Sequence, residues 1–222
     1  MDRETYLRDP CLASALPFWK TEQVRIPENI RVIREDLFGG CPAGSDEPYF
    51  KLIHRLEAVE PPALPPGFAF VSCDLGEYAE HIRLCYADVG VSAEELREYT
   101  GRPVFDPALW VAVRDEATGR IAATGIAELD RSIGEGALEW IQVSPAYRRR
   151  GLGRCVVREL LSRLQGRAAF VTVSGRVNGP EDPRALYRSC GFTGPVIWHV
   201  VTVPPRTDPA REETDRNKKT GA

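Results

Sequence analysis

The feature that most constrains this chain is the stretch at residues 143–153, Val-Ser-Pro-Ala-Tyr-Arg-Arg-Arg-Gly-Leu-Gly, which lies between two periodic segments. Residues 137–143 alternate as a β-strand does. After the stretch, apolar residues recur at helical spacing up to Leu164, and Gly166 is a C-terminal stop signal. Glycine lets an anion approach the backbone, and the first N–H groups of a helix point at it. The order strand, basic turn, amphipathic helix therefore predicts a phosphate-binding turn.

The alternation also predicts which side chains of the strand share a face. We expect Leu138, Trp140 and Gln142 on one face, and Glu139, Ile141 and Val143 on the other. Glu139 is thus expected on the same face as the residues that lead into the turn.

Composition limits the class of protein. With 222 residues and 43% apolar content, the chain suits one domain of ordinary size with an extension. No apolar run approaches the length of a membrane span, and the mixed charge of residues 1–4 does not suggest a secretory signal. A net charge of −3 argues against a general nucleic-acid binder. We expect a cytoplasmic protein that binds neither nucleic acid nor membranes.

The cysteines do not form a Cys-x-x-Cys pair, so neither a metal site nor a disulfide framework is expected. Reduced, buried thiols fit this scatter better. The six are Cys11, Cys41, Cys73, Cys85, Cys155 and Cys190.

Residues 1–64 are interpreted as an accessory segment that covers an edge of the main domain, forms a subunit contact or walls the substrate pocket. Strand-like alternation occurs at residues 24–26, 30–33 and 50–56, and residues 39–48 are expected to form a loop. His54, in an alternating strand, is interpreted as a partly buried structural residue. Four prolines and Gly67 then mark a stiff boundary.

The main domain is expected at residues 65–203. A strand at 68–73 is followed by two helices, the first capped by Asp74 and the second opened by the capping box of Ser92 and Glu95. Strands at 109–114, 120–128 and 137–143 come next, and then the long helix. A strand at 168–173, a short helix at 184–190 capped by Asp182, and a strand at 195–203 complete the domain. Residues 204–222 are predicted to be a disordered tail.

Two motifs resemble a known family. The order Arg148-x-x-Gly151-x-Gly153 resembles the acetyl-CoA-binding signature Gln/Arg-x-x-Gly-x-Gly/Ala of the GNAT acetyltransferase superfamily. The segment from Ala185 to Phe192, Ala-Leu-Tyr-Arg-Ser-Cys-Gly-Phe, resembles the late motif of the same family. The resemblance covers residues 67–203 and implies an α/β (α+β) fold with a mixed, mostly antiparallel central sheet flanked by helices.

The resemblance implies transfer of the acetyl group of acetyl-CoA, a cosubstrate, directly to a primary amine without a metal. It implies that the backbone of residues 141–143 pairs with the pantetheine arm, and that the Val143 N–H binds the thioester carbonyl. The residues implied in coenzyme binding are Ile141, Gln142, Val143, Arg148, Arg149, Arg150, Gly151, Leu152, Gly153 and Arg154. Asn178, nine residues before Tyr187, is a further residue that the resemblance implies.

Tyr187 is the implied general acid, presenting its hydroxyl to the coenzyme sulfur. An alkyl ammonium has a pKa near 10.4, so a base must remove its proton before the nitrogen attacks. Glu139 is the first candidate for this base, and Glu128, at the end of the preceding strand, is the second.

The acceptor is left open. A small-molecule amine is the leading hypothesis, and a protein N-terminus or lysine shares every motif. An acyl-CoA-binding sensor without catalysis is the alternative of a different class. A homodimer is considered, and residues 85–105 and 1–64 are expected to determine the acceptor.

Overall fold

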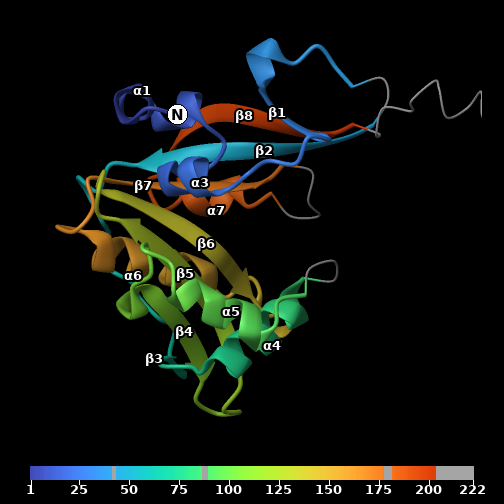
Figure 1. The fold of residues 1–222 in the computed structure, drawn as a ribbon. Helices are drawn as coiled ribbons and strands as arrows, with labels where there is room; N and C mark the ends of the chain where they lie inside the picture. The colour runs from blue at the N-terminus through green and yellow to red at the C-terminus, as the bar shows by residue number, and fades with distance from the viewer. Residues whose placement is uncertain (42–43, 87–89, 178–181, 204–222) are drawn as a thin grey trace, which may run out of the picture.

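The computed structural model describes residues 1–41, 44–86, 90–177 and 182–203, and one mixed sheet runs through them (Figure 1). Its strands are β1 (Ile30–Arg34), β2 (Ser45–His54), β3 (Phe68–Val71), β4 (Trp110–Asp115), β5 (Ile121–Asp130), β6 (Glu135–Val143), β7 (Phe170–Arg176) and β8 (Thr193–Thr202). They lie in the order β1-β8-β2-β7-β6-β5-β4-β3. β6 and β7 are parallel, and the other paired strands of this sheet are antiparallel. The predicted fold class is confirmed.

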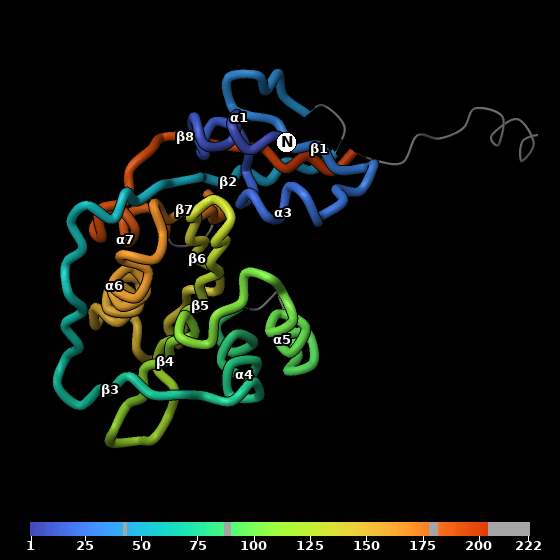
Figure 2. The backbone as a smooth tube through the Cα atoms, turned by 60° about the vertical axis from the view of Figure 1, so that its left-hand side comes forward, coloured from blue at the N-terminus to red at the C-terminus, as the bar shows by residue number. Residues whose placement is uncertain are grey.

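Helices cover both faces of the β4–β6 part of the sheet, with α6 on one face and α4 and α5 on the other (Figure 2). In chain order the α-helices are α1 (Arg3–Arg8), α2 (Pro10–Ala13), α3 (Phe18–Gln23), α4 (Leu75–Cys85), α5 (Ala93–Thr100), α6 (Leu152–Leu164) and α7 (Arg184–Arg188). Short 3-10 turns are η1 (Glu35–Leu37), η2 (Pro107–Leu109) and η3 (Pro145–Tyr147).

Local signals set the ends of the main-domain helices. Asp74 and Ser92 each form the complete capping box, Ser92 as predicted, which satisfies two N–H groups at the start of α4 and of α5. The apolar stripe of α6 is almost fully buried, with Val156, Val157 and Leu160 each 0% exposed. Each such side chain contributes about 1.5–3 kcal/mol on burial. The stripe holds α6 against β5, β6 and β4.

The N-terminal segment is part of the sheet. β2 lies between β7 and β8 and pairs with both, so the last strand of the chain meets a strand from residues 45–54 (Figure 1). A buried network holds residues 6–18 against this part. Glu135 accepts hydrogen bonds from the Tyr6 hydroxyl (2.7 Å) and the Phe18 N–H (2.8 Å), and the Lys51 ammonium donates to the Leu16 carbonyl (2.8 Å).

Two expectations for the N-terminal segment are wrong. Residues 24–26 are not a strand, because they leave α3 and lead into the turn before β1. The predicted loop at 39–48 ends earlier, since Ser45–Pro48 already pair with β8. The other predicted strands overlap strands of the sheet with shifted ends, and helices form at 75–85, 93–100 and 152–164 as predicted. The tail at 204–222 lies outside the described residues.

The start of α7 differs by one residue from the prediction. Pro183 is the N-cap, and the helix ends at Arg188 before the glycine turn at Gly191. Asp182 still accepts a hydrogen bond from the Arg184 N–H at 2.9 Å. It therefore satisfies a free N–H at the helix start from one position further out.

A β-bulge in β6 overturns the predicted faces of this strand. Thr124 pairs with Gln142 but Ile126 pairs with Glu139, so two residues of β6 lie opposite Gly125. Trp140, with φ at +50°, is one of these two residues. Period-2 alternation cannot reveal an extra residue in a strand. Such a residue exchanges the predicted faces of all strand residues on one side of it.

The bulge thus moves Glu139 to the other face. Glu139, Trp140 and Gln142 lie on the α4 face, where Trp140 joins the cluster with Ile126 and Ile82. Leu138, Ile141 and Val143 lie on the α6 face and pack in the larger core.

Candidate functional site

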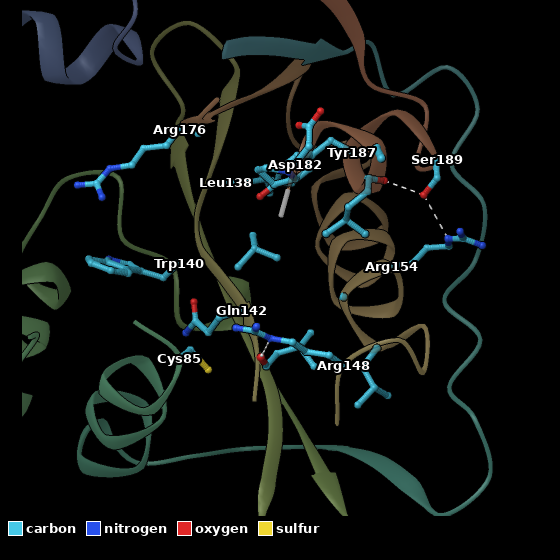
Figure 3. A pocket seen from close by; sticks show the side chains of 18 of the residues that line it. Cys85, Leu138, Trp140, Gln142, Arg148, Arg154, Arg176, Asp182, Tyr187 and Ser189 are labelled. Atoms are coloured by element: carbon cyan, nitrogen blue, oxygen red, sulfur yellow. Dashed lines mark hydrogen bonds between the residues drawn. The ribbon is translucent and has the colours of Figure 1, made fainter. Parts of the chain in front are cut away.

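A cleft opens where β6 and β7 separate. The two strands pair only from Glu135–Leu138 with Phe170–Val173, and beyond Leu138 their facing edges diverge. The cleft has a volume of about 1550 Å³ and is lined by both strands, α7 and the start of α6. Figure 3 shows Trp140, Gln142 and Cys85 on one side of β6, and Tyr187, Arg154 and Ser189 on the other.

The turn between β6 and α6 fits an anion. Gly151 has φ at +83° and Arg149 at +64°, so the chain passes through the left-handed region twice before the helix. The first helical hydrogen bond runs from the Cys155 N–H to the Gly151 carbonyl, which leaves the N–H groups of residues 152–154 for a ligand. The first turn of α6 contains no acidic residue. Dipole, N–H groups and arginines together favour a diphosphate here.

The second glycine of the turn has a packing role. A Cβ at Gly153 would lie 3.3 Å from Leu186 Cδ2 and 3.5 Å from Val143 Cγ2. Gly153 therefore lets α6 approach α7 and the end of β6 closely. Arg148 is held by a hydrogen bond from its Nε to the Val143 carbonyl at 3.4 Å.

On the edge of β6 that faces the cleft, backbone groups point away from β5. The Ser144 N–H donates to the Ala122 carbonyl of β5 at 2.9 Å. In an antiparallel ladder, successive N–H groups point to opposite edges, so the Val143 N–H is directed away from β5 toward the cleft. An amide-containing chain such as pantetheine fits this edge.

Tyr187 lies in the wall of the cleft on α7, and its side chain is 7% exposed. Its ring packs against Phe50 of β2 and Phe192, with centroids 5.9 and 5.6 Å away. Burial raises the pKa of the Tyr187 phenol, and nearby charge adds to this effect. The phenol is therefore protonated at neutral pH, as a proton donor must be.

Glu139 lines the cleft, and its carboxylate forms an ion pair with the Lys20 ammonium of α3. Burial lowers the pKa of Lys20, but the charges of Glu139 and Glu128 outweigh burial and the pKa is raised overall. Lys20 is therefore a cation at neutral pH.

Glu128 differs from Glu139 in its surroundings. It is 3% exposed, and its two oxygens accept hydrogen bonds from Trp19 Nε1 (2.9 Å) and Arg102 Nη1 (2.7 Å). Burial, and then the charge of Glu139, raises the pKa of Glu128. Its side chain is occupied in linking α3 to the segment after α5, whereas Glu139 faces the cleft.

Most residues expected at the site line the cleft together: Glu139, Ile141, Gln142, Val143, Arg148, Arg149, Gly151, Leu152, Gly153, Arg154 and Tyr187. Arg150 does not; its guanidinium lies over the Tyr147 ring, 5.4 Å from the centroid. Asn178 lies outside the described residues. His54 is buried beside Phe192 and accepts the Leu56 N–H, as expected of a structural histidine.

Several residues of the site escaped the sequence reasoning. Lys20 contacts Glu139 and Trp19 contacts Glu128, each from more than 100 positions away in the sequence. No local pattern indicates such contacts. Tyr49 and Arg176 line the cleft because β2 pairs with β7. His81 and Cys85 lie four residues apart on α4, with Nε2 and Sγ 3.8 Å apart, and this spacing is a local pattern that could have indicated this wall.

The described residues carry neither a membrane-spanning helix nor a metal-binding cluster. None of their helices is long and apolar enough to cross a membrane. They also contain no cluster of three or more histidine, cysteine or acidic side chains that could hold a metal ion.

A splayed parallel strand pair, a glycine-arginine turn at a helix start and a tyrosine in the cleft wall lie together at one site, an arrangement that fits a protein that binds coenzyme A. Comparison with known proteins agrees. Residues 106–194 match the family model of the acetyltransferase (GNAT) domain. The matched segment runs from just before η2 to the start of β8 and contains both the glycine turn and Tyr187.

Individual relatives are more distant. Glucosamine 6-phosphate N-acetyltransferase 1 of Oryza sativa subsp. japonica is 34% identical over 89 residues, which are 38% of this chain and 52% of that protein. The chain thus spans about half the length of this curated relative.

Solved structures agree on the fold. A GCN5-related N-acetyltransferase from Sphaerobacter thermophilus matches with a TM-score of 0.65 at 18% identity, over 79% of this chain and 60% of that one. A GCN5-related N-acetyltransferase from Kribbella flavida matches with a TM-score of 0.52 at 17% identity, over 79% and 68%.

Proposed function

We propose that this chain is an acetyl-CoA-dependent N-acetyltransferase that moves the acetyl group directly to a primary amine of a small molecule. The observation that carries the proposal is the cleft between β6 and β7, which combines the anion-binding turn with the Tyr187 phenol. Acetyl-CoA supplies the activated acetyl thioester. A relative that is named for acetylating glucosamine 6-phosphate supports a small acceptor.

Each part of the cleft has a role in this proposal. The N–H groups of residues 152–154, with Arg148, Arg149 and Arg154 nearby, hold the coenzyme diphosphate. The edge of β6 aligns the pantetheine arm. The Val143 N–H stabilises the negative charge that develops on the thioester oxygen, the kind of contact that is usually the largest catalytic contribution.

Proton transfer is assigned to two side chains. Glu139 accepts the proton of the incoming amine, directly or through a water molecule, and its place on the cleft wall favours it over Glu128, which is buried and does not line the cleft. Tyr187 donates a proton to the departing thiolate, because its raised pKa keeps it protonated. No covalent enzyme intermediate is required.

The test is release of free coenzyme A from acetyl-CoA in the presence of small amines and of peptides with a free N-terminus or lysine. Turnover with small amines supports the proposal, and turnover with peptides alone would assign a protein acceptor instead. Tight coenzyme binding without thiol release for any acceptor would contradict catalysis and favour a sensor.

A further inference from the structure

A chain of buried hydrogen bonds lies behind the cleft, on the α4 side of β6. His81 of α4 contacts the Thr124 hydroxyl with Nδ1 (2.9 Å) and the Ser144 hydroxyl with Nε2 (2.8 Å). The Gln142 amide nitrogen donates to the same Thr124 oxygen at 2.5 Å. All four side chains are buried, with at most 6% of each exposed.

The partners determine the direction of each of these hydrogen bonds. Burial lowers the pKa of His81 to about 4, so the ring is neutral at pH 7 and carries one N–H. Ser144 donates its hydroxyl proton to the Ile121 carbonyl (3.1 Å) and therefore accepts from His81 Nε2. His81 Nδ1 must then accept from the Thr124 hydroxyl.

The orientation of Gln142 follows from that direction. Because Thr124 donates to His81, its oxygen accepts, and only the NH₂ end of the Gln142 amide can supply the proton. The amide oxygen is thereby turned away from Thr124. Two elements, α4 and β5, thus hold one side chain of β6 in a single orientation.

That amide oxygen is buried and has no hydrogen-bond partner among the described residues. The indole N–H of Trp140, two positions earlier, is likewise buried and unpartnered within that part of the chain. Both side chains line the cleft on the face that carries Glu139 (Figure 3). Native proteins leave few such groups unsatisfied, since each costs about 1–3 kcal/mol.

The two groups have complementary needs, because Gln142 Oε1 only accepts and Trp140 Nε1 only donates. A hydroxyl group both accepts and donates, so hydroxyl groups match the needs of both atoms, whereas a methyl or methylene group matches neither. Their face of β6 is opposite to the face that packs on α6, where the phosphate turn begins. A ligand on this face is therefore the acceptor rather than the coenzyme.

We propose that Gln142 and Trp140 form an acceptor subsite for a hydroxyl group next to the transferred amine, so that the preferred acceptors are amino alcohols. This inference rests on the proposed acetyltransferase function. Thr124 and His81 are positioning residues, which act by fixing the Gln142 amide. A site built to bond a hydroxyl discriminates against the analogue that lacks it, because its polar groups are then left unpaired.

The experiment compares trans-2-aminocyclohexanol with cyclohexylamine, and 2-aminoethanol with ethylamine, in wild type and Gln142→Met. The variant keeps the side-chain length and removes the oxygen. We expect wild type to prefer the hydroxylated member of each pair by at least about tenfold in kcat/KM, the size of one hydrogen bond to a buried group. Gln142→Met should reduce that ratio to near one, mainly through KM. Dividing the kcat/KM preference of wild type by that of Gln142→Met cancels the different basicities of the two amines in each pair.

Two further variants separate orientation from folding. Thr124→Val removes the hydroxyl that fixes the Gln142 amide without changing Gln142, and should reduce the preference by a smaller factor. Thr124→Ser keeps the hydroxyl and should restore the preference. Gln165→Met makes the same chemical change at the exposed end of α6 and should leave both ratios unchanged.

Calorimetric binding of the same amines to the complex with coenzyme A gives a readout that needs no turnover. Absence of turnover with every amine would contradict the proposed function, while the binding preference and its loss in Gln142→Met would still support the subsite. Equal binding of both members by wild type, or an unchanged preference in Gln142→Met, would overturn the inference. A weaker affinity for coenzyme A with an unchanged amine preference would also overturn it, by assigning the oxygen to the coenzyme.

Discussion

The Lys20 ammonium of α3 forms an ion pair with the Glu139 carboxylate of β6, which lines the cleft. The Lys20 and Glu139 side chains are only 20% and 26% exposed. The contact joins two residues that are 119 positions apart and brings the N-terminal segment to the proposed catalytic base. Residues 1–64 thus supply an ion-pair partner for a cleft residue as well as strands of the sheet.

We expect Lys20→Met to destabilise the protein by about 1–3 kcal/mol, because it leaves a largely buried carboxylate without its cation. Glu139→Gln in the same background should restore part of that loss. Urea unfolding of the two single variants and the double variant measures the coupling energy. The exposed pair of Arg8 and Glu4 is the control, and its variants should change stability by less than about 0.5 kcal/mol. Additive effects at Lys20 and Glu139 would contradict the pairing.

Tyr187→Phe should lower kcat by about 10²-fold while the affinity for coenzyme A stays nearly unchanged, because the ring packing remains and only the proton donor is lost. Stopped-time assays of thiol release and calorimetry with coenzyme A measure the two quantities. Tyr78→Phe removes a phenol from the buried cluster under α4, outside the cleft, and serves as the control. Unaltered turnover in Tyr187→Phe would remove the tyrosine from its proposed role.

Gly151→Ala and Gly166→Ala form a matched pair at the two ends of α6. Both glycines have positive φ, at +83° and +74°, and a Cβ added at either position would meet no other residue beyond its chain neighbours within 4 Å. Each substitution should cost about 1–2 kcal/mol of stability, as for other non-glycine residues in the left-handed region. Only Gly151→Ala should weaken binding of coenzyme A. Equal affinities in the two variants would argue against the turn as the diphosphate site.

The stability of the protein should fall as the pH is lowered from about 6.5 to about 4. Burial lowers the pKa of His81 from 6.5 to about 4, so in this window the unfolded chain binds a proton that the folded chain does not. The loss reaches about 3 kcal/mol when the window has been crossed. His81→Gln should flatten this part of the curve in urea titrations at graded pH. A pH dependence that is identical in the variant would contradict a buried neutral His81.

Gly125→Ala should destabilise the protein, because the bulge places this glycine under α6. Its Cβ would lie 2.4 Å from Val156 Cγ1 and 2.9 Å from Ile141 Cδ1, and the neighbours are fully packed. Overpacking of this kind costs about 1–3 kcal/mol. Gly39→Ala, where a Cβ meets nothing within 4 Å, should be nearly neutral in the same thermal unfolding experiment. If only Gly39→Ala lowered the melting temperature, the conclusion that Gly125 is the tightly packed position would be wrong.

Periodicity and short motifs predicted the elements of the main domain because their causes are local. The stripe of α6, the capping box of Ser92 and the turn at Gly151 each depend on residues within a few positions of one another. The bulge at Trp140 could not be found in this way, since alternation assumes one residue per position on the partner strand. The predicted face of Glu139 was wrong for that reason.

The sequence by itself determined the strand, turn and helix of the proposed anion site, because backbone amides and a glycine conformation need no distant partner. Only the tertiary structure decided what surrounds the acceptor. Pairing of β2 with β7 brings Tyr49 to the cleft, docking of α3 brings Lys20 to Glu139, and packing of α4 on β5 orients Gln142 through His81 and Thr124. These contacts join residues that are far apart in the chain, and burial and hydrogen-bond geometry select them only when the whole sheet has formed.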